Sequence, residues 1–309
     1  MRFWFLGSGS FAALCLASMV RKFFFERIIT GKPTLAGRGL KETPSCVEET
    51  AARLGLISER TGPLSQNENL ITAITTNPPD VLFVIDFGQL IREPLLSAPR
   101  YGCLNIHPSL LPRWRGAAPV PRALMNGDST TGVTLFRLTE AMDAGPVIRQ
   151  IEIPIGLEAT SADLYEILAR EGSQTAYDGV QCLIEGSCQI SAQNSEFATQ
   201  ATKISKTEFQ ISWQQNSLDI HNTVRALVSS RGAFVVVNNM RLKVWRTLPV
   251  EPPSEGTPGQ VVSFMEGDPV VLCGKGALRL QEVQCEGKRR VTGAEWACGV
   301  RLKTGEVLS

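Results

Sequence analysis

Short apolar runs alternate with helix-like segments along the first half of this 309-residue chain. Strand-like runs lie at Arg2–Leu6, Arg27–Thr30, Val81–Ile85 and Cys103–His107. Helix-like segments lie between them, at Phe11–Val20, Cys46–Leu54 and Glu68–Thr75. Because parallel strands need long crossover connections, this alternation predicts a Rossmann-like, doubly wound, mainly parallel α/β sheet with helices on both faces.

The character of the chain changes near residue 186. Before it we expect a helix at Val120–Met125, strands at Thr131–Leu138 and Pro146–Ile155, and an amphipathic helix at Ala162–Ile184. A segment rich in Ser, Gln and Asn follows, which is typical of a linker. The expected elements beyond it are a helix at Asn216–Val228 and strands at Phe234–Val237, Arg241–Arg246, Gln260–Phe264, Val270–Cys273 and Ala277–Gln284. We therefore predict an α/β domain at residues 1–186, a linker at 187–205 and an OB-like β-barrel domain at 206–309.

The charge balance differs between the two halves. The chain is 43% hydrophobic and 20% charged with a net charge of +1, as expected for an ordinary globular protein. From residue 201 onward, however, it carries 14 Lys and Arg against 10 Asp and Glu, and the rest carries 17 against 20. A mildly basic C-terminal part fits a domain that faces RNA, although surface charge of this size is also common in other proteins.

Cysteine and histidine usage argues against metal binding and for a cytoplasmic protein. The eight cysteines include no Cys-x-x-Cys pair, and with two histidines there are too few ligands for a typical zinc site. We expect free thiols in a reducing compartment rather than a disulfide framework. The apolar start resembles a signal peptide, but Gly7–Gly9 interrupts it with a strand-to-helix turn, and no stretch is long enough to span a membrane.

Gly7-Ser8-Gly9 with Ala12 is a fragment of a dinucleotide-binding fingerprint. The acidic residue that this motif requires at the end of the second strand is missing, because Ile29–Gly31 occupies that place. We interpret the glycines as a tight turn against a substrate cleft, and not as a nicotinamide site of a dehydrogenase.

Asn105 and His107 end one of the predicted strands, two residues apart, so both side chains leave the same face. Asp143 lies in a second turn-forming segment, Glu140–Pro146. An amide donor, a proton carrier near neutral pH and a carboxylate are the groups that acyl transfer uses. Each residue also has a structural interpretation, as a hydrogen-bonded strand-end histidine or an aspartate that forms a turn.

The combination of these segments resembles the folate-dependent formyltransferase family. Asn105–His107, Ser109–Pro112 and Asp143 match its signature in order and spacing. The resemblance extends to further segments: Phe5–Gly7, Phe11–Ala12, Ala36–Gly39, Pro44–Ser45, Arg113–Pro119, Lys203–Lys206, Ile211–Trp213 and Lys243–Trp245. It covers nearly the whole chain and is densest in the first two-thirds.

The resemblance implies transfer of a formyl group from 10-formyltetrahydrofolate to the free amino group of initiator methionyl-tRNA, in support of translation initiation. It implies tetrahydrofolate as product, no metal, a monomer in the cytoplasm and a tRNA-binding role for the OB-like domain. An N-formyltransferase that acts on an amino sugar nucleotide is the alternative. A non-catalytic RNA-binding module would not need Asn105, His107 and Asp143 together.

Residue roles follow from the resemblance. Asn105, His107 and Asp143 are the expected catalytic residues. The expected folate-binding residues are Ser109, Leu110, Leu111, Pro112, Phe87 and Gly88. The loop from Gly31 to Ser45 is expected to contact tRNA through Lys32, Arg38 and Lys41.

Three positions depart from the family pattern. Two adjacent lysines usually follow the Gly-Arg-Gly, but this chain has Leu40-Lys41-Glu42, where Glu42 cancels positive charge. Asp86 replaces an alanine and places a carboxylate near the expected folate pocket. Ser229–Gly232 lacks the prolines usual at that place.

Overall fold

The computed structural model describes residues 1–36 and 41–308, which form two compact units. The first unit comprises Met1–Gly116, Thr130–Pro154 and Tyr165–Ala201, and the second comprises Ala117–Ser129, Ile155–Leu164 and Thr202–Ser309. Two short segments of the first 186 residues thus belong with the C-terminal residues, and the segment expected to be a linker belongs with the first unit as far as Ala201. The boundaries at 186 and 205 stay a prediction.

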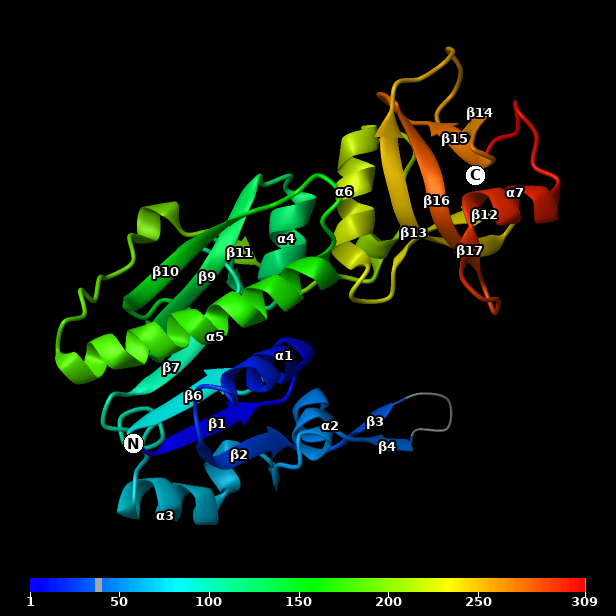
Figure 1. The fold of residues 1–309 in the computed structure, drawn as a ribbon. Coiled ribbons are helices and arrows are strands. Elements are labelled where there is room, and N and C mark those ends of the chain that lie inside the picture. Colours follow the sequence, from blue (N-terminus) through cyan, green and yellow to red (C-terminus); the bar gives the residue numbers. More distant parts are fainter. Residues whose placement is uncertain (37–40, 309) are drawn as a thin grey trace. The chain divides into compact units, whose positions relative to one another are not determined.

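The first unit is built on a seven-stranded mixed sheet with the order β10-β9-β7-β6-β1-β2-β5 (Figure 1). Its strands are β1 (Phe3–Gly7), β2 (Phe25–Gly31), β5 (Glu59–Thr61), β6 (Val81–Ile85), β7 (Cys103–His107), β9 (Thr130–Arg137) and β10 (Val147–Pro154). The strands from β7 to β5 are parallel, and β9 and β10 are antiparallel. Five parallel strands therefore bring their carboxyl ends to one edge.

Helices cover both faces of this sheet because the strand residues alternate between them. The helices are α1 (Ser10–Met19), α2 (Cys46–Arg53), α3 (Glu68–Thr76) and α5 (Ser161–Glu185), with 3₁₀ turns at Leu64–Gln66 and Ser195–Phe197. Trp4 and Leu6 pack in one core cluster with Leu70 of α3. Phe3 instead joins an aromatic cluster through Phe23 that reaches α5. The mainly parallel, doubly wound arrangement predicted from the sequence is confirmed.

The Gly31–Ser45 segment is not all loop. Thr34–Ala36 (β3) and Lys41–Thr43 (β4) pair as an antiparallel hairpin beside α2 (Figure 1). Two two-residue strands, Arg115–Gly116 (β8) and Gln200–Ala201 (β11), pair in parallel. Strands this short carry no readable alternation of apolar and polar residues, which is why the sequence did not predict them.

One pair of cysteines is bonded. Cys182 and Cys188 form a disulfide at the end of α5, with Cα atoms 5.0 Å apart. The expectation of free thiols throughout is therefore wrong for this pair. The helix ends at Glu185, and the following Gly186, with a φ of 69°, reverses the chain and returns residue 188 to the last helical turn. Six-residue spacing does not reveal that reversal.

The second unit contains an antiparallel sheet with the order β12-β13-β16-β15-β14, and β17 pairs with β16. Its elements are α4 (Pro119–Met125), 3₁₀ turn Thr207–Phe209, α6 (Ser217–Leu227), β12 (Ala233–Val237), β13 (Met240–Val250), β14 (Val261–Met265), β15 (Asp268–Leu272), β16 (Ala277–Cys285), β17 (Val291–Thr292) and α7 (Gly293–Val300). Val224 of α6 packs with Val244, Leu280 and Trp296 in its core. The five predicted strands are all present, and α7 and β17 are additional.

Candidate active site

Asn105 and His107 lie at the carboxyl end of β7, which runs between parallel β6 and antiparallel β9. The Asn105 Nδ2 atom donates to the Val84 carbonyl oxygen at 2.7 Å, which leaves its second hydrogen for another acceptor. The Asn105 Oδ1 atom is buried and has no hydrogen-bond donor among the described residues. A buried amide oxygen is normally paired, so this site suits a ligand that brings an N–H group.

His107 is 5% exposed, and the contact of its Nε2 atom indicates which ring nitrogen carries the proton in the neutral form. Nε2 lies 2.8 Å from the carbonyl oxygen of Trp114, which can only accept. We therefore assign the neutral ring a proton on Nε2. Nδ1 faces the Asp143 Oδ2 atom at 3.9 Å, beyond direct hydrogen-bond distance. Nδ1 is thus the ring nitrogen with a lone pair, and it faces the Asp143 carboxylate.

Asp143 lies in the turn between β9 and β10, as the sequence predicted, with a φ of 49°. Its Oδ2 atom accepts a hydrogen bond from the Gly116 backbone N–H at 2.8 Å. Gly116 itself has a φ of 123°, and a Cβ there would lie 2.8 Å from the Ala201 carbonyl oxygen. Only glycine allows the backbone at residue 116 to lie this close to Ala201, and this position sets where the Gly116 N–H meets the Asp143 carboxylate.

Gln193 also belongs to this constellation, and sequence reasoning missed it. Its Nε2 atom donates to the carbonyl oxygens of Asp143 and Gly145 at 2.9 and 2.8 Å. Its Oε1 atom accepts from the Arg115 guanidinium at 3.0 and 2.7 Å. Gln193 lies in the Ser-, Gln- and Asn-rich stretch that resembles a linker, where nothing distinguishes one glutamine from its neighbours.

The loop expected to bind folate, Ser109–Pro112, is held by polar contacts. The Ser109 hydroxyl is buried and donates to the Arg113 carbonyl oxygen at 2.7 Å. Thr134 accepts from the Leu111 N–H at 3.1 Å, and Gln150 donates to the Leu111 carbonyl oxygen at 2.7 Å. Leu111 is buried, whereas Leu110 and Pro112 are partly exposed. Ser109 and Leu111 therefore hold the loop against β9 and β10, and Leu110 and Pro112 are its partly exposed side chains.

The Asp86–Gly88 segment follows β6. Phe87 is buried in the core cluster beneath the sheet, and Gly88 is exposed with a φ of 78°. The Asp86 carboxylate accepts hydrogen bonds from the backbone N–H groups of Phe11 and Ala12 at the start of α1, and desolvation there raises its pKa. A Cβ on Gly9 would lie 1.8 Å from this carboxylate. The Asp86 carboxylate thus occupies the N-terminus of α1, the place that a dinucleotide phosphate would need, in agreement with the interpretation of the glycines as a turn.

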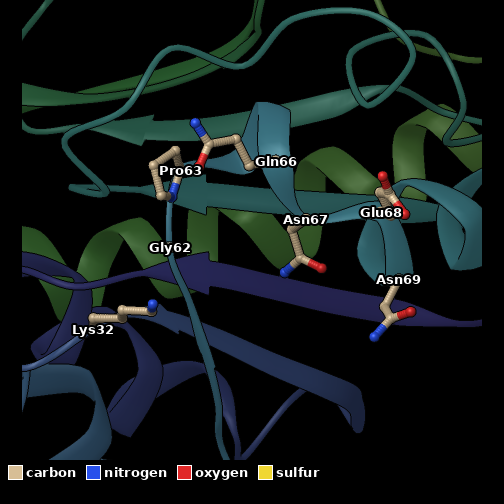
Figure 2. A pocket seen from close by; sticks show the side chains of 7 residues that line it. All are labelled: Lys32, Gly62, Pro63, Gln66, Asn67, Glu68 and Asn69. Atoms are coloured by element: carbon tan, nitrogen blue, oxygen red, sulfur yellow. The ribbon is translucent and has the colours of Figure 1, made fainter.

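Lys32 follows the carboxyl end of β2 and lines a polar pocket of about 380 Å³ (Figure 2). The other lining residues are Gly62, Pro63, Gln66, Asn67, Glu68 and Asn69. Gly62 follows β5, so the pocket lies at the same sheet edge as His107. Of the other cations expected to contact tRNA, Lys41 lies in β4 and Arg38 lies outside the described residues.

Within residues 1–36 and 41–308, no three His, Cys, Asp or Glu side chains are grouped so that they could hold a metal ion. In the same part of the chain no helix is long and apolar enough to cross a membrane.

The fold and this site define a class of protein, and comparison with known proteins agrees. Residues 1–180 match the formyl transferase family, and residues 203–301 match the formyl transferase C-terminal domain. The chain belongs to the formyl transferase family.

Two full-length relatives are named methionyl-tRNA formyltransferase. The protein from Aromatoleum aromaticum is 36% identical over 98% of this chain and 95% of its own, and that from Paracoccus denitrificans is 35% identical over 98% of both.

Solved structures share the fold at lower identity. HypX from Aquifex aeolicus, solved with tetrahydrofolic acid, is 17% identical with a TM-score of 0.65 over 99% of this chain and 48% of that longer chain. The N-formyltransferase from Helicobacter canadensis, solved with folinic acid and dTDP-3-aminofucose, is 18% identical with a TM-score of 0.62 over 90% of this chain and 98% of its own.

Proposed function

We propose that this protein transfers the formyl group of 10-formyltetrahydrofolate to the amino group of initiator methionyl-tRNA. The observation that carries this proposal is the His107–Asp143 pair beside Asn105 at the end of β7. Full-length relatives named methionyl-tRNA formyltransferase, at 35–36% identity, support the acceptor.

The reaction assigns a task to each residue. The amine nitrogen attacks the formyl carbon, an oxyanion forms, and the bond from that carbon to the folate nitrogen then breaks. The second Nδ2 hydrogen of Asn105 donates to the oxyanion. His107 Nδ1 takes the proton that leaves the attacking amine and returns it to the departing nitrogen, and Asp143 stabilises the imidazolium formed in between.

The Ser109–Pro112 loop and the Phe87–Gly88 segment are the folate-binding elements in this proposal. The buried contacts of Ser109 and Leu111 support that role because they hold the loop backbone in one shape against β9 and β10. Rigid backbone polar groups are suited to reading the edge of a pteridine ring.

Residues of the Gly31–Ser45 segment are the proposed contacts to the acceptor end of the tRNA, with Lys32, Arg38 and Lys41 as its cations. Lys32 supports this role because its ammonium group lies by a polar pocket at the edge of the sheet that carries His107. The domain of residues 206–309 is the proposed second tRNA contact. We further propose a cytoplasmic monomer, which sedimentation velocity of the purified protein tests.

A formylation assay tests the function. The full chain is mixed with 10-formyltetrahydrofolate and one of three acceptors: charged initiator tRNA, uncharged initiator tRNA or a dTDP-linked amino sugar. Formyl-methionine only in the first reaction is the expected result. Formylation of the sugar, with none of the tRNA, would establish the alternative acceptor.

Lys32→Ala should weaken tRNA binding several-fold and lower the slope of log affinity against log salt by about 1, because one phosphate contact is lost. Lys22→Ala is a matched control, since Lys22 precedes β2 whereas Lys32 follows it, at the opposite end of the same strand. Folate affinity should change in neither variant. Filter binding at two salt concentrations measures the effect, and equal tRNA affinity of the two variants would remove Lys32 from the interface.

A further inference from the structure

Residues 191–201 of the first unit bind two separate loops of the candidate active site. Ser191 pairs with Val147, next to the turn that carries Asp143. Thr199 accepts from the Trp114 N–H at 2.8 Å through its hydroxyl and from the Arg115 N–H at 2.9 Å through its carbonyl oxygen. This stretch is therefore part of the site's framework, although its composition resembles that of a linker.

Gln193 is the side chain that joins the two loops. Its amide N–H groups hold the Asp143 and Gly145 carbonyl oxygens, and its amide oxygen holds the Arg115 guanidinium. Arg115 is 9% exposed, and a buried guanidinium needs an acceptor to offset its desolvation. One glutamine thus satisfies polar groups on both loops, a task that requires a donor and an acceptor on the same side chain.

The geometry between His107 and Asp143 depends on the same two loops. Trp114 and Gly116 lie in one loop; the Trp114 carbonyl oxygen contacts His107 Nε2, and the Gly116 N–H donates to the Asp143 carboxylate. Asp143 itself lies in the other loop. Asp143 also adopts a φ of 49°, a left-handed conformation that aspartate tolerates but that is still uncommon in residues other than glycine. Hydrogen bonds from Gln193 to the carbonyl oxygens of residues 143 and 145 hold this turn on both sides of Ala144.

We infer that Gln193 is a positioning residue for the formyl transfer proposed above, acting through the Asp143 turn to keep the carboxylate opposite His107 Nδ1. It touches neither reacting group in this arrangement. Its loss should reduce turnover without a matching loss of folate affinity, because a displacement of about 1 Å in a catalytic group can cost roughly 100-fold.

Steady-state kinetics of Gln193→Ala, with Gln174→Ala as matched control, tests the kinetic part. Gln174 is an exposed glutamine on α5 that also bonds two side chains, Lys22 and Asp178. We expect kcat to fall roughly 10- to 100-fold in Gln193→Ala with KM for the formyl donor within about 3-fold, and no change in Gln174→Ala. Gln193→Glu keeps the acceptor for Arg115 but loses the donors, so it should not restore activity.

A double-mutant cycle with Asp143→Asn separates positioning from general damage. If Gln193 acts through Asp143, then Gln193→Ala should cost less than about 3-fold in the Asp143→Asn background. An equal cost in both backgrounds, or turnover of Gln193→Ala equal to that of the Gln174 control, would overturn the inference.

A readout independent of activity tests the inference even if the proposed reaction is wrong. The chain has two histidines, so ¹⁵N-histidine labelling gives two imidazole spectra, and His107→Ala identifies which is which. Gln193→Ala should move the His107 signals and leave those of His221 unchanged. Unmoved His107 signals in a folded variant would overturn the positioning role, whereas an inactive wild-type protein would count only against the proposed reaction.

Discussion

The two histidines lie in different units and have similar surroundings at first sight. His107 is 5% exposed and His221 is 3% exposed. In each ring the Nε2 atom lies near a backbone carbonyl oxygen, that of Trp114 at 2.8 Å or that of Leu157 at 3.1 Å. Burial and one hydrogen bond therefore do not distinguish the proposed catalytic histidine, His107, from His221.

The two histidines differ in the group that faces the Nδ1 atom. His107 Nδ1 faces the Asp143 carboxylate, whereas His221 Nδ1 lies 2.9 Å from the Thr247 hydroxyl. Desolvation lowers the pKa of His221, and the nearby Arg225 guanidinium lowers it further, so the ring stays neutral near pH 7. His221 even lines a cavity of about 430 Å³ in the second unit. If His107 is the proton carrier that we propose, the carboxylate that faces its Nδ1 atom distinguishes it from His221 better than burial or a nearby cavity does.

The largest expected effect comes from removing each ring in turn. His107→Ala should lower formyl-transfer turnover by roughly 10²–10⁴-fold, the range for a positioned acid–base group. His221→Ala should leave turnover within a few-fold of wild type and instead cost about 1–3 kcal/mol of stability, since Leu157 and Thr247 lose a partner. Steady-state kinetics and urea unfolding measure both. Near-normal turnover of His107→Ala would end the comparison.

Each histidine also has an asparagine nearby in sequence, which sharpens the contrast. Asn105→Ala should lower turnover by about 10²–10³-fold, as for loss of an oxyanion donor, with folate affinity little changed. Asn222 accepts a hydrogen bond from the Arg225 Nε atom at 2.9 Å, so Asn222→Ala should reduce stability and not turnover. The same two assays apply, and an equal kinetic loss in both variants would mean that Asn105 has no special role.

The smallest effect is a pH dependence of stability. A lowered pKa of folded His221 means that the unfolded chain binds a proton below about pH 6.5 while the folded chain does not. Stability from this residue is therefore present above that pH and is lost as the pH falls through 6.5 toward the lower, folded value. The melting temperature of wild type should drop more than that of His221→Asn between pH 7.5 and 5.5. Parallel curves would show that His221 does not titrate with unfolding.

Much of the fold could be predicted from local patterns. β6 and β7 begin and end where the apolar runs do. α2 and α3 differ from the expected helices by one residue at the C-terminal end, and α6 differs by one residue at each end. These elements have continuous apolar runs, apolar residues at helical spacing, or recognisable N-cap residues such as Ser45 before α2. The β3–β4 hairpin, the short β8–β11 pair and the Cys182–Cys188 bond depend on contacts between distant or reversed segments, which no local pattern records.

The candidate site divides in the same way. Spacing and residue type made Asn105, His107 and Asp143 candidates, because chemistry restricts which side chains can do acyl transfer and strand geometry places two of them on one face. The resemblance to a known family assigned them catalytic roles, which stay a prediction. Only the tertiary structure decided which histidine nitrogen is free, that Asp86 is directed at α1, and that Gln193 joins the two loops. Each depends on a backbone carbonyl or N–H group brought close by folding, and every residue carries those groups alike, so the sequence alone cannot specify which of them meet.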